Sequence, residues 1–260
     1  MDFISGEILC IDKPLRWTSF DVVNKVRWSL CRHLGVKKLK VGHAGTLDPL
    51  ATGLMLVCTG KATKRIDELQ AQTKEYVATV QLGATTPSFD LEQPVDACFS
   101  TEHITRETVE QMLQQFVGHI QQVPPTFSAV KVDGKRAYSI ARTARDVVIQ
   151  PKDIVISELE LLDYNPTPEN SIQTALLPRE GMRRKAFLTA NIDNATRAYG
   201  PSFDIRVVCS KGTYIRALAR DMGIALASGA HLTALRRTRV GDYSVEQAIT
   251  MDDFMHNLQS

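Results

Sequence analysis

The loop at residues 41–53 concentrates glycine, threonine and histidine around a single carboxylate, that of Asp48. Pro49 follows Asp48, and steric clash with the proline ring disfavours the α region for the residue before it. We therefore expect Asp48 on extended or turn backbone, just before the apolar run Leu54–Cys58. An ordinary Asp-Pro turn is the alternative. The glycines allow a ligand to approach the backbone closely, which favours a site in which Asp48 takes part in chemistry.

Arg216 stands where a cation is unfavourable. The apolar pattern predicts a helix over residues 214–227, capped by Thr213, with Arg216 in its first turn. That turn carries partial positive charge. The arginine either points into water or serves an anion at this junction, where backbone N–H groups converge. Asp48 is the obvious anion, and pairing with Arg216 would keep its carboxylate ionised and fixed in direction.

Tyr76 begins a segment in which apolar and polar residues alternate up to Leu82, which is the period of a half-buried strand. The tyrosine shares the apolar face of that strand. A core tyrosine is the ordinary interpretation, and the strand taken alone favours it.

The most basic segment of the chain follows an Asp133-Gly134 pair, which is typical of a hairpin turn. We expect a helix over Lys135–Asp146. Basic residues with an aromatic residue among them suit a phosphate backbone, whereas a solvent-exposed helix is an equal alternative. The segment contains Lys135, Arg136, Arg142 and Arg145, with Tyr138 among them.

The composition is that of an ordinary globular protein: 260 residues, of which 43% are hydrophobic and 23% charged, with a net charge of +2 that says little about partners. The five cysteines form no C-x-x-C pair, and four lie in apolar patterns, so we expect buried free thiols. The histidines lack metal-site spacing, and we expect no metal. The sequence contains neither a signal peptide nor an apolar run long enough to cross a membrane. We therefore expect a cytoplasmic protein without membrane contact.

The hydrophobic pattern predicts helices and strands in mixed order, which indicates an α+β fold. Thr18 and Asp21 mark a helix start, and Phe20, Val23, Val26, Leu30 and Leu34 follow at helical spacing. Residues 163–202 have weak periodicity, and we interpret them as an insertion, partly mobile. Other helices are predicted near 60–70 and 105–117 and after the Ser244–Gln247 box, and strands near 7–11, 54–58, 76–82, 154–162, 203–209 and 232–240.

Several of these segments together resemble the TruB-type tRNA pseudouridine synthases. The central loop alone is a specific signal, and the matching segments follow one another in the family's order from about residue 6 to residue 243. The segments are Leu9–Pro14, Gly42–Gly53, Lys74–Tyr76, Val123–Pro125 with Ser128–Lys131, Ser210–Arg216, and Gly229–Leu232 with Leu235–Arg237.

The resemblance implies an enzyme that isomerises one uridine in the T-loop of tRNA, at position 55, by breaking its N-glycosidic bond and rejoining the base through C5. Asp48 would be the catalytic carboxylate, acting by covalent addition or by removing a sugar proton on the way to a glycal. Arg216 would hold Asp48, while Tyr76 would stack on the flipped base and sit where a proton could be relayed from C5. The other substrate contacts would come from His43, Tyr214 and Leu235.

The resemblance also implies a pseudouridine synthase fold, with a mixed, mostly antiparallel central sheet flanked by helices. We expect one catalytic domain over residues 1–260, with an insertion at about 163–202 and, because the chain ends at Ser260, no C-terminal accessory RNA-binding domain. The segment Thr126–Arg145 resembles an insertion that clasps the T-arm. The residues that would face RNA phosphates are Lys131, Lys135, Arg136 and Arg142.

An isomerisation consumes no redox equivalent or phosphate donor, so we expect no cofactor, a tRNA T-arm stem-loop as the partner, and a monomer. Two rival functions use the same residues differently. A non-catalytic RNA binder on this scaffold would not need the Asp48 carboxylate. An aspartyl phosphotransferase would use Asp48, but the sequence lacks the G-x-x-x-x-G-K-[ST] motif that cradles phosphates.

Overall fold

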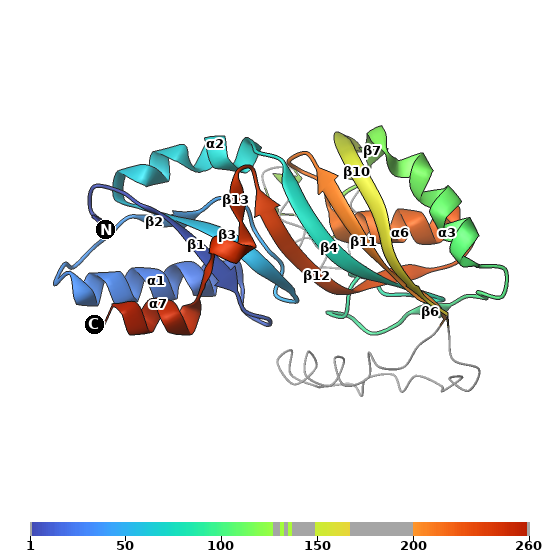
Figure 1. The fold of residues 1–260 in the computed structure, drawn as a ribbon, viewed down its shortest axis with the longest axis horizontal. Helices are drawn as coiled ribbons and strands as arrows, with labels where there is room; N and C mark the ends of the chain where they lie inside the picture. Colours follow the sequence, from blue (N-terminus) through green and yellow to red (C-terminus); the bar gives the residue numbers. More distant parts are fainter. Residues whose placement is uncertain (1, 127–130, 133–134, 137–148, 167–199, 259–260) are drawn as a thin grey trace. The chain divides into compact units, whose positions relative to one another are not determined.

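The computed structural model describes residues 2–126, 131–132, 135–136, 149–166 and 200–258. The chain divides into two compact units, one of residues 1–77 with 235–260 and one of residues 78–234. Two strands, β4 (Lys74–Leu82) and β12 (Ala230–Val240), contribute residues to both units. Figure 1 shows the elements of each unit.

The first unit is built on strand β3 (Ala51–Thr59), which directly follows the Asp48 loop. Strand β1 (Ile8–Lys13) pairs antiparallel with β3, from Ile8 opposite Cys58 to Lys13 opposite Gly53. Strand β2 (Val41–His43) is also antiparallel to β3, whereas the end of β12 runs parallel to it, with Leu235 opposite Ala51. Two short strands complete this part of the sheet: β13 (Tyr243–Ser244) on β12 and β14 (Ile249–Thr250) on β1.

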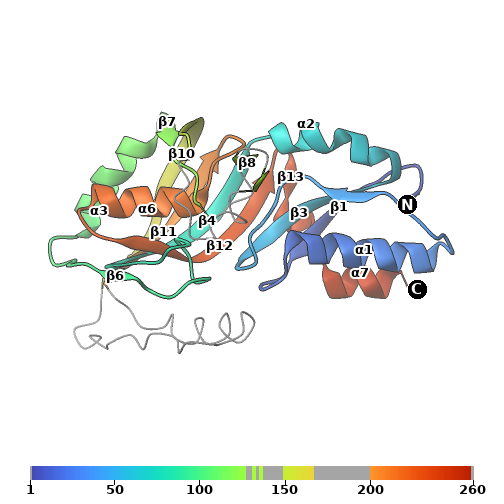
Figure 2. The same cartoon turned by 180° about the vertical axis from the view of Figure 1, so that it is seen from behind.

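Helices cover both faces of the first unit's sheet, and the alternation along β3 decides which residues each face receives. Met55 and Val57 pack with α1 (Ser19–His33) and α7 (Met251–Asn257). Leu54, Leu56 and Cys58 pack toward Leu69 of α2 (Ile66–Ala71) instead. Figures 1 and 2 both show α1 beside α7, with α2 on the other side of β1 and β3. The sheet is therefore buried on both faces where it carries the loop.

The structure confirms the predicted helix start at Thr18 more fully than the predicted buried face of that helix. Thr18 caps α1 in the predicted box with Asp21. Val23, Val26 and Leu30 are buried as predicted, but Phe20 is 66% exposed, because the buried stripe passes through Ser19 and Val22 instead. The predicted helix near 60–70 is a 3₁₀ helix, η1 (Gly60–Arg65), followed by α2. The Ser244–Gln247 box caps a single 3₁₀ turn, η3 (Val245–Gln247).

In the second unit, β4, β11 (Ser202–Cys209), β10 (Lys152–Asn165) and β7 (Gly118–Gln122) are neighbours in that order. Its helices are α3 (Arg106–Leu113), extended by the 3₁₀ turn η2 (Gln114–Phe116), and α6 (Ile215–Ala225). The alternating residues predicted to be buried on β4 and β11 are buried. Two small hairpin pairs are β5 (Ala84–Thr85) with β6 (Ala97–Cys98), and β8 (Lys131–Val132) with β9 (Lys135–Arg136).

Two predictions about the second unit are wrong. Lys135 and Arg136 lie in a strand and not in a helix, because they pair with Val132 and Lys131 across the predicted turn. Helix α6 is not capped by Thr213: Tyr214 is the N-cap residue, and the Thr213 hydroxyl donates to the carbonyl of Ser210. The turn at 133–134, the remainder of the predicted basic helix (137–148) and most of the predicted insertion (167–199) lie outside the described residues.

The strand pairings confirm the predicted α+β class with a mixed, mostly antiparallel sheet. Pairs β1–β14 and β3–β12 are parallel, whereas β1–β3, β2–β3, β12–β13, β7–β10 and β10–β11 are antiparallel. All five cysteines are free; Cys58 and Cys209 are buried, and Cys98 is exposed. Among the described residues, no helix is long and apolar enough to cross a membrane.

Candidate active site

The Asp48 loop joins β2 to β3 and is fixed to the first unit at several points. The amide of Ala44 donates to the carbonyl of Leu56 (2.9 Å). The hydroxyl of Ser19, at the start of α1, accepts from the amide of Leu47 (2.8 Å) and donates to its carbonyl (3.0 Å). Asp48 itself is half-buried, outside any strand or helix. The predicted turn at the mouth of a strand is thus confirmed, and Asp48 is not fully buried in it.

Lys13 is a fully buried cation at the end of β1, next to this loop. Its Nζ donates to the carbonyl oxygens of Trp17 (2.6 Å), Pro14 (3.0 Å) and Pro49 (3.4 Å). Burial lowers the pKa of Lys13 to about 8, and the opposing attraction of Asp48 keeps that pKa from falling further. Lys13 therefore binds the backbone directly after Asp48 and places a positive charge near its carboxylate.

Arg237 is a second buried cation, 1% exposed, on β12. Its Nε donates to the carbonyl of Leu54 (2.7 Å) and its Nη2 to the carbonyl of Gly45 (3.2 Å), so one guanidinium joins the loop to β3. The backbones of β3 and β12 meet closely here. A β-carbon on Gly53, which has φ of +100°, would overlap the carbonyl of Arg237 and lie 2.8 Å from its amide nitrogen. Only glycine fits where the two backbones approach this closely.

His43 lies half-buried at the end of β2. Burial lowers the pKa of its imidazole; a backbone hydrogen bond with Gly45 opposes this shift, and the nearby charge of Arg237 adds to it. Within the described part of the chain, its buried Nδ1 has no hydrogen-bond partner. The side chain is therefore a neutral ring beside the loop.

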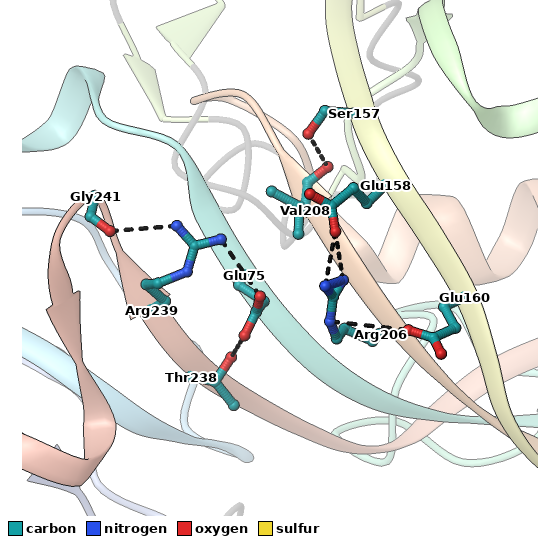
Figure 3. A network of polar contacts seen from close by, with 9 residues as sticks. All are labelled: Glu75, Ser157, Glu158, Glu160, Arg206, Val208, Thr238, Arg239 and Gly241. Carbon is teal, nitrogen blue, oxygen red and sulfur yellow. Dashed lines mark hydrogen bonds and ion pairs between the residues drawn. The ribbon is translucent and has the colours of Figure 1, made fainter.

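Tyr76 and Leu235, the other predicted site residues of the first unit, lie on β4 and β12. Tyr76 is 9% exposed, and Leu235 is half-buried opposite Ala51, the first residue of β3. Beside Tyr76, the Glu75 carboxylate accepts from the hydroxyl of Thr238 (2.7 Å) and from Nη2 of Arg239 (3.4 Å), as Figure 3 shows. These bonds tie the start of β4 to the end of β12.

Arg216 is the second residue of α6 and is 6% exposed, so it does not point into water. Its Nη1 donates to the carbonyl of Ser88 (2.9 Å), and its Nε lies 3.7 Å from Oδ2 of Asp90. Burial raises the pKa of the Asp90 carboxyl to about 6, against the attraction of Arg216. Asp90 is thus a charge partner of Arg216 within the second unit.

Sequence reasoning did not single out Lys13 and Arg237, which hold the Asp48 loop, or Asp90, which pairs with Arg216. Lys13 and Arg237 belong to segments that carry the resemblance, but their role depends on carbonyl oxygens far away in sequence. Asp90 lies in a short irregular loop whose composition gives no signal.

The second unit also contains exposed ion pairs that are separate from these contacts. Arg206 on β11 donates to Oε2 of Glu158 on β10 from two nitrogens, each at 2.7 Å (Figure 3). Glu158 is 55% exposed, and ion pairs so open to water contribute little to stability.

The structure brings Asp48 and the charge of Lys13 together, and it places Tyr214 and Arg216 side by side at the start of α6. The pairing of Asp48 with Arg216 stays a prediction. Lys131, Lys135 and Arg136 share the β8–β9 pair, while Arg142 lies outside the described residues. Among the described residues, no group of three His, Cys, Asp or Glu side chains could hold a metal ion.

The fold and the loop that carries Asp48 are those of the pseudouridine synthase class. Residues 32–183 match the TruB family pseudouridylate synthase (N terminal domain), and residues 216–259 match the tRNA pseudouridylate synthase B C-terminal domain. The chain therefore belongs to the TruB family of pseudouridylate synthases.

Individual relatives agree with this assignment. The chain is 58% identical over 254 residues to a tRNA pseudouridine synthase B of Phocaeicola vulgatus, and the match covers 98% of this chain and 94% of the relative. It is 47% identical over 259 residues to that of Flavobacterium johnsoniae, covering 99% and 98%. Among solved structures, a chain of a Cbf5–Nop10–Gar1 complex has a TM-score of 0.63 at 27% identity; the match covers 98% of this chain but only 54% of that one.

Proposed function

We propose that this protein isomerises uridine to pseudouridine at position 55 in the T-loop of tRNA. The observation that carries the proposal is the half-buried Asp48, on a loop that two buried cations, Lys13 and Arg237, fix in place. The relatives named above are tRNA pseudouridine synthases, which supports tRNA as the substrate.

The reaction breaks the bond between N1 of uracil and C1′ of the ribose, and forms a bond between C5 and C1′. The C5 proton leaves, and N1 ends with a proton, so the step needs no oxidant or reductant. Asp48 assists the cleavage, either by adding covalently or by removing a sugar proton on the way to a glycal. In both routes the carboxylate must be ionised and held in direction, and nearby positive charges favour that state.

The reacting atoms lie inside a folded RNA loop, so the nucleotide must first be flipped out, at a cost of a few kcal/mol. Stacking on Tyr76 and apolar contact with Leu235 would offset that cost, because every base offers an aromatic face. His43 would lie against the RNA where the nucleotide leaves its loop, and Tyr214 would complete the uracil pocket. Arg216 would fix Asp48 in a charge-assisted pair, in addition to its contacts with Ser88 and Asp90.

The basic residues of the β8–β9 pair, Lys131, Lys135 and Arg136, would bind phosphates of the T-arm, together with Arg142. Lysine and arginine contacts to phosphates position a nucleic acid without reading its sequence. We propose a monomeric, cytoplasmic enzyme that acts without a cofactor.

Tritium release tests the proposal directly. A T-arm stem-loop RNA labelled with tritium at C5 of uridine is incubated with the protein, and we expect one equivalent of tritium in the solvent for each RNA converted. A second RNA with cytidine at the target position serves as the control and should release none. Binding of the uridine RNA without any release would favour the non-catalytic RNA binder and overturn the proposed reaction.

A further inference from the structure

Gln122, the last residue of β7, is a polar side chain buried to 1% exposure. Its Oε1 accepts from the amide of Tyr214 (2.9 Å), and its Nε2 donates to the carbonyl of the same residue (3.1 Å). The oxygen and the nitrogen of the side-chain amide therefore both bind the backbone of one residue, Tyr214. Because one end must accept and the other must donate, only one orientation of the amide satisfies both bonds.

Tyr214 is the residue from which α6 starts, and it has no side-chain capping bond of its own. Helix starts leave backbone N–H groups without helical partners, so the position of this turn must be set from outside the helix. Gln122 supplies that restraint. The preceding turn is fixed separately, since the amide and hydroxyl of Ser210 bind the backbone of Val155 (2.8 and 2.9 Å).

The same end of β7 contacts α6 one turn further on. Nη2 of Arg220 donates to the carbonyl of Val123 (2.9 Å), and the Arg220 guanidinium lies 5.1 Å from the ring centre of Phe89. Phe89 separates Ser88 from Asp90, which are the partners of Arg216. The first turns of α6 are therefore held between the end of β7 and the Ser88–Asp90 loop.

We propose that Gln122 is a positioning residue for the isomerisation, which acts by fixing the start of α6 and, through it, Tyr214 and Arg216. This inference rests on the proposed function. Because Gln122 is buried and bonded to the backbone of Tyr214, it would act on the reaction through the positions of Tyr214 and the Arg216 guanidinium. Displacing a catalytic group by about 1 Å can lower a rate about 100-fold, so a small shift of this turn is enough to matter.

The test compares Gln122→Met with Gln121→Met. Methionine has nearly the size of glutamine but can make neither bond to Tyr214. Gln121 is the adjacent glutamine, exposed on the same strand, and provides the matched control. For each variant we measure the rate constant of a single turnover at saturating protein, the dissociation constant for a T-arm RNA, and the unfolding midpoint.

We expect the turnover rate constant of Gln122→Met to fall at least about tenfold while the dissociation constant changes less than about threefold. Gln121→Met should match the wild type. If Gln122→Met does not fold, Gln122→Glu, which retains the acceptor for the Tyr214 amide, should show the same division between rate and affinity. A wild-type rate in a folded Gln122 variant overturns the inference, as does a loss confined to affinity. A wild-type protein that forms no pseudouridine overturns the proposed function instead.

Discussion

At the scale of single residues, the proposed chemistry depends on a charged oxygen at Asp48. Asp48→Asn keeps the shape of the side chain and removes its charge. We expect pseudouridine formation to fall by at least about four orders of magnitude, since the group acts on the reacting bonds, while RNA affinity stays within about threefold. Tritium release and filter binding with the same RNA check both parts. Substantial turnover by this variant would remove Asp48 from its proposed role.

Asp90 predicts how the rate depends on pH. Its pKa of about 6 lies above the ordinary value of 3.8 because burial disfavours the charged form. In the folded protein the carboxyl therefore takes up a proton as the pH falls through about 6, and Arg216 loses the charge of this partner. We expect the single-turnover rate to fall together with that protonation. Rates measured from about pH 5 to pH 8 should show this step.

Asp90→Asn is the matched variant, since an amide stays neutral throughout. Its rate should be low at all these pH values and lack the step near 6. The sign for stability is the reverse of the usual carboxylate case. Because the folded state holds this proton more tightly than the unfolded state, Asp90 contributes less to stability as the pH rises from about 4 to 6. A step that persists in Asp90→Asn would belong to another group.

At the scale of elements, the β8–β9 pair carries the proposed phosphate contacts. Replacing Lys135 and Arg136 by alanine should weaken T-arm binding and reduce the slope of log affinity against log salt concentration by roughly 1 to 2, because fewer counterions are released. Binding measured at several salt concentrations gives the slope. Lys37→Ala with Lys38→Ala, which removes two exposed lysines between α1 and β2, serves as the control. An unchanged slope would mean that Lys135 and Arg136 face water.

Elements whose signals are local were predictable from sequence. The Thr18–Asp21 box fixes the start of α1 within one turn of chain, and the alternation of Phe203, Ile205 and Val207 marks β11 with the correct face. Lys135 and Arg136 were predicted to be helical from local composition but lie in a strand, because they pair with Val132 and Lys131 across a turn. The turn backbone of the Asp48 loop was predictable because its glycines and its proline act on their own backbone.

The supports of that loop were not predictable in the same way. Arg237 donates to Gly45, 192 residues earlier in the chain, and Lys13 donates to Pro49, 36 residues later. A fully buried lysine or arginine is also rare enough that ordinary pattern reasoning places both on the surface. The ion pair of Asp90 was equally hidden from sequence reasoning, because its partner Arg216 belongs to a helix far away in the sequence.

At the scale of the whole molecule, the net charge of +2 gives no general attraction for RNA, so binding must come from local clusters and from the pocket. Binding should nevertheless stabilise the entire chain. A T-arm RNA present at about 100 times its dissociation constant should add about 2.7 kcal/mol to the free energy of unfolding, which raises the unfolding midpoint by several degrees.

Asp48→Asn should show the same rise in midpoint as the wild type, because it keeps the binding surface. Thermal unfolding followed with and without the RNA checks this, and an RNA of scrambled sequence and equal length is the control. Equal stabilisation by the scrambled RNA would indicate attraction to phosphate alone, and no stabilisation by either RNA would contradict a tRNA substrate.

The close approach of the neighbouring strands β3 and β12 at Gly53 has a consequence for how this enzyme could change. Arg237 lies opposite Gly53 itself, and Leu235 lies two residues earlier on β12, opposite Ala51, where β3 begins after the Asp48 loop. Even one methyl group at Gly53 would force the two backbones apart, and with them the strand segment that carries Leu235 and the loop that carries Asp48. We therefore expect the proposed uracil contact of Leu235 and the proposed catalytic position of Asp48 to be mechanically linked, so that a variant that changes one should disturb the other.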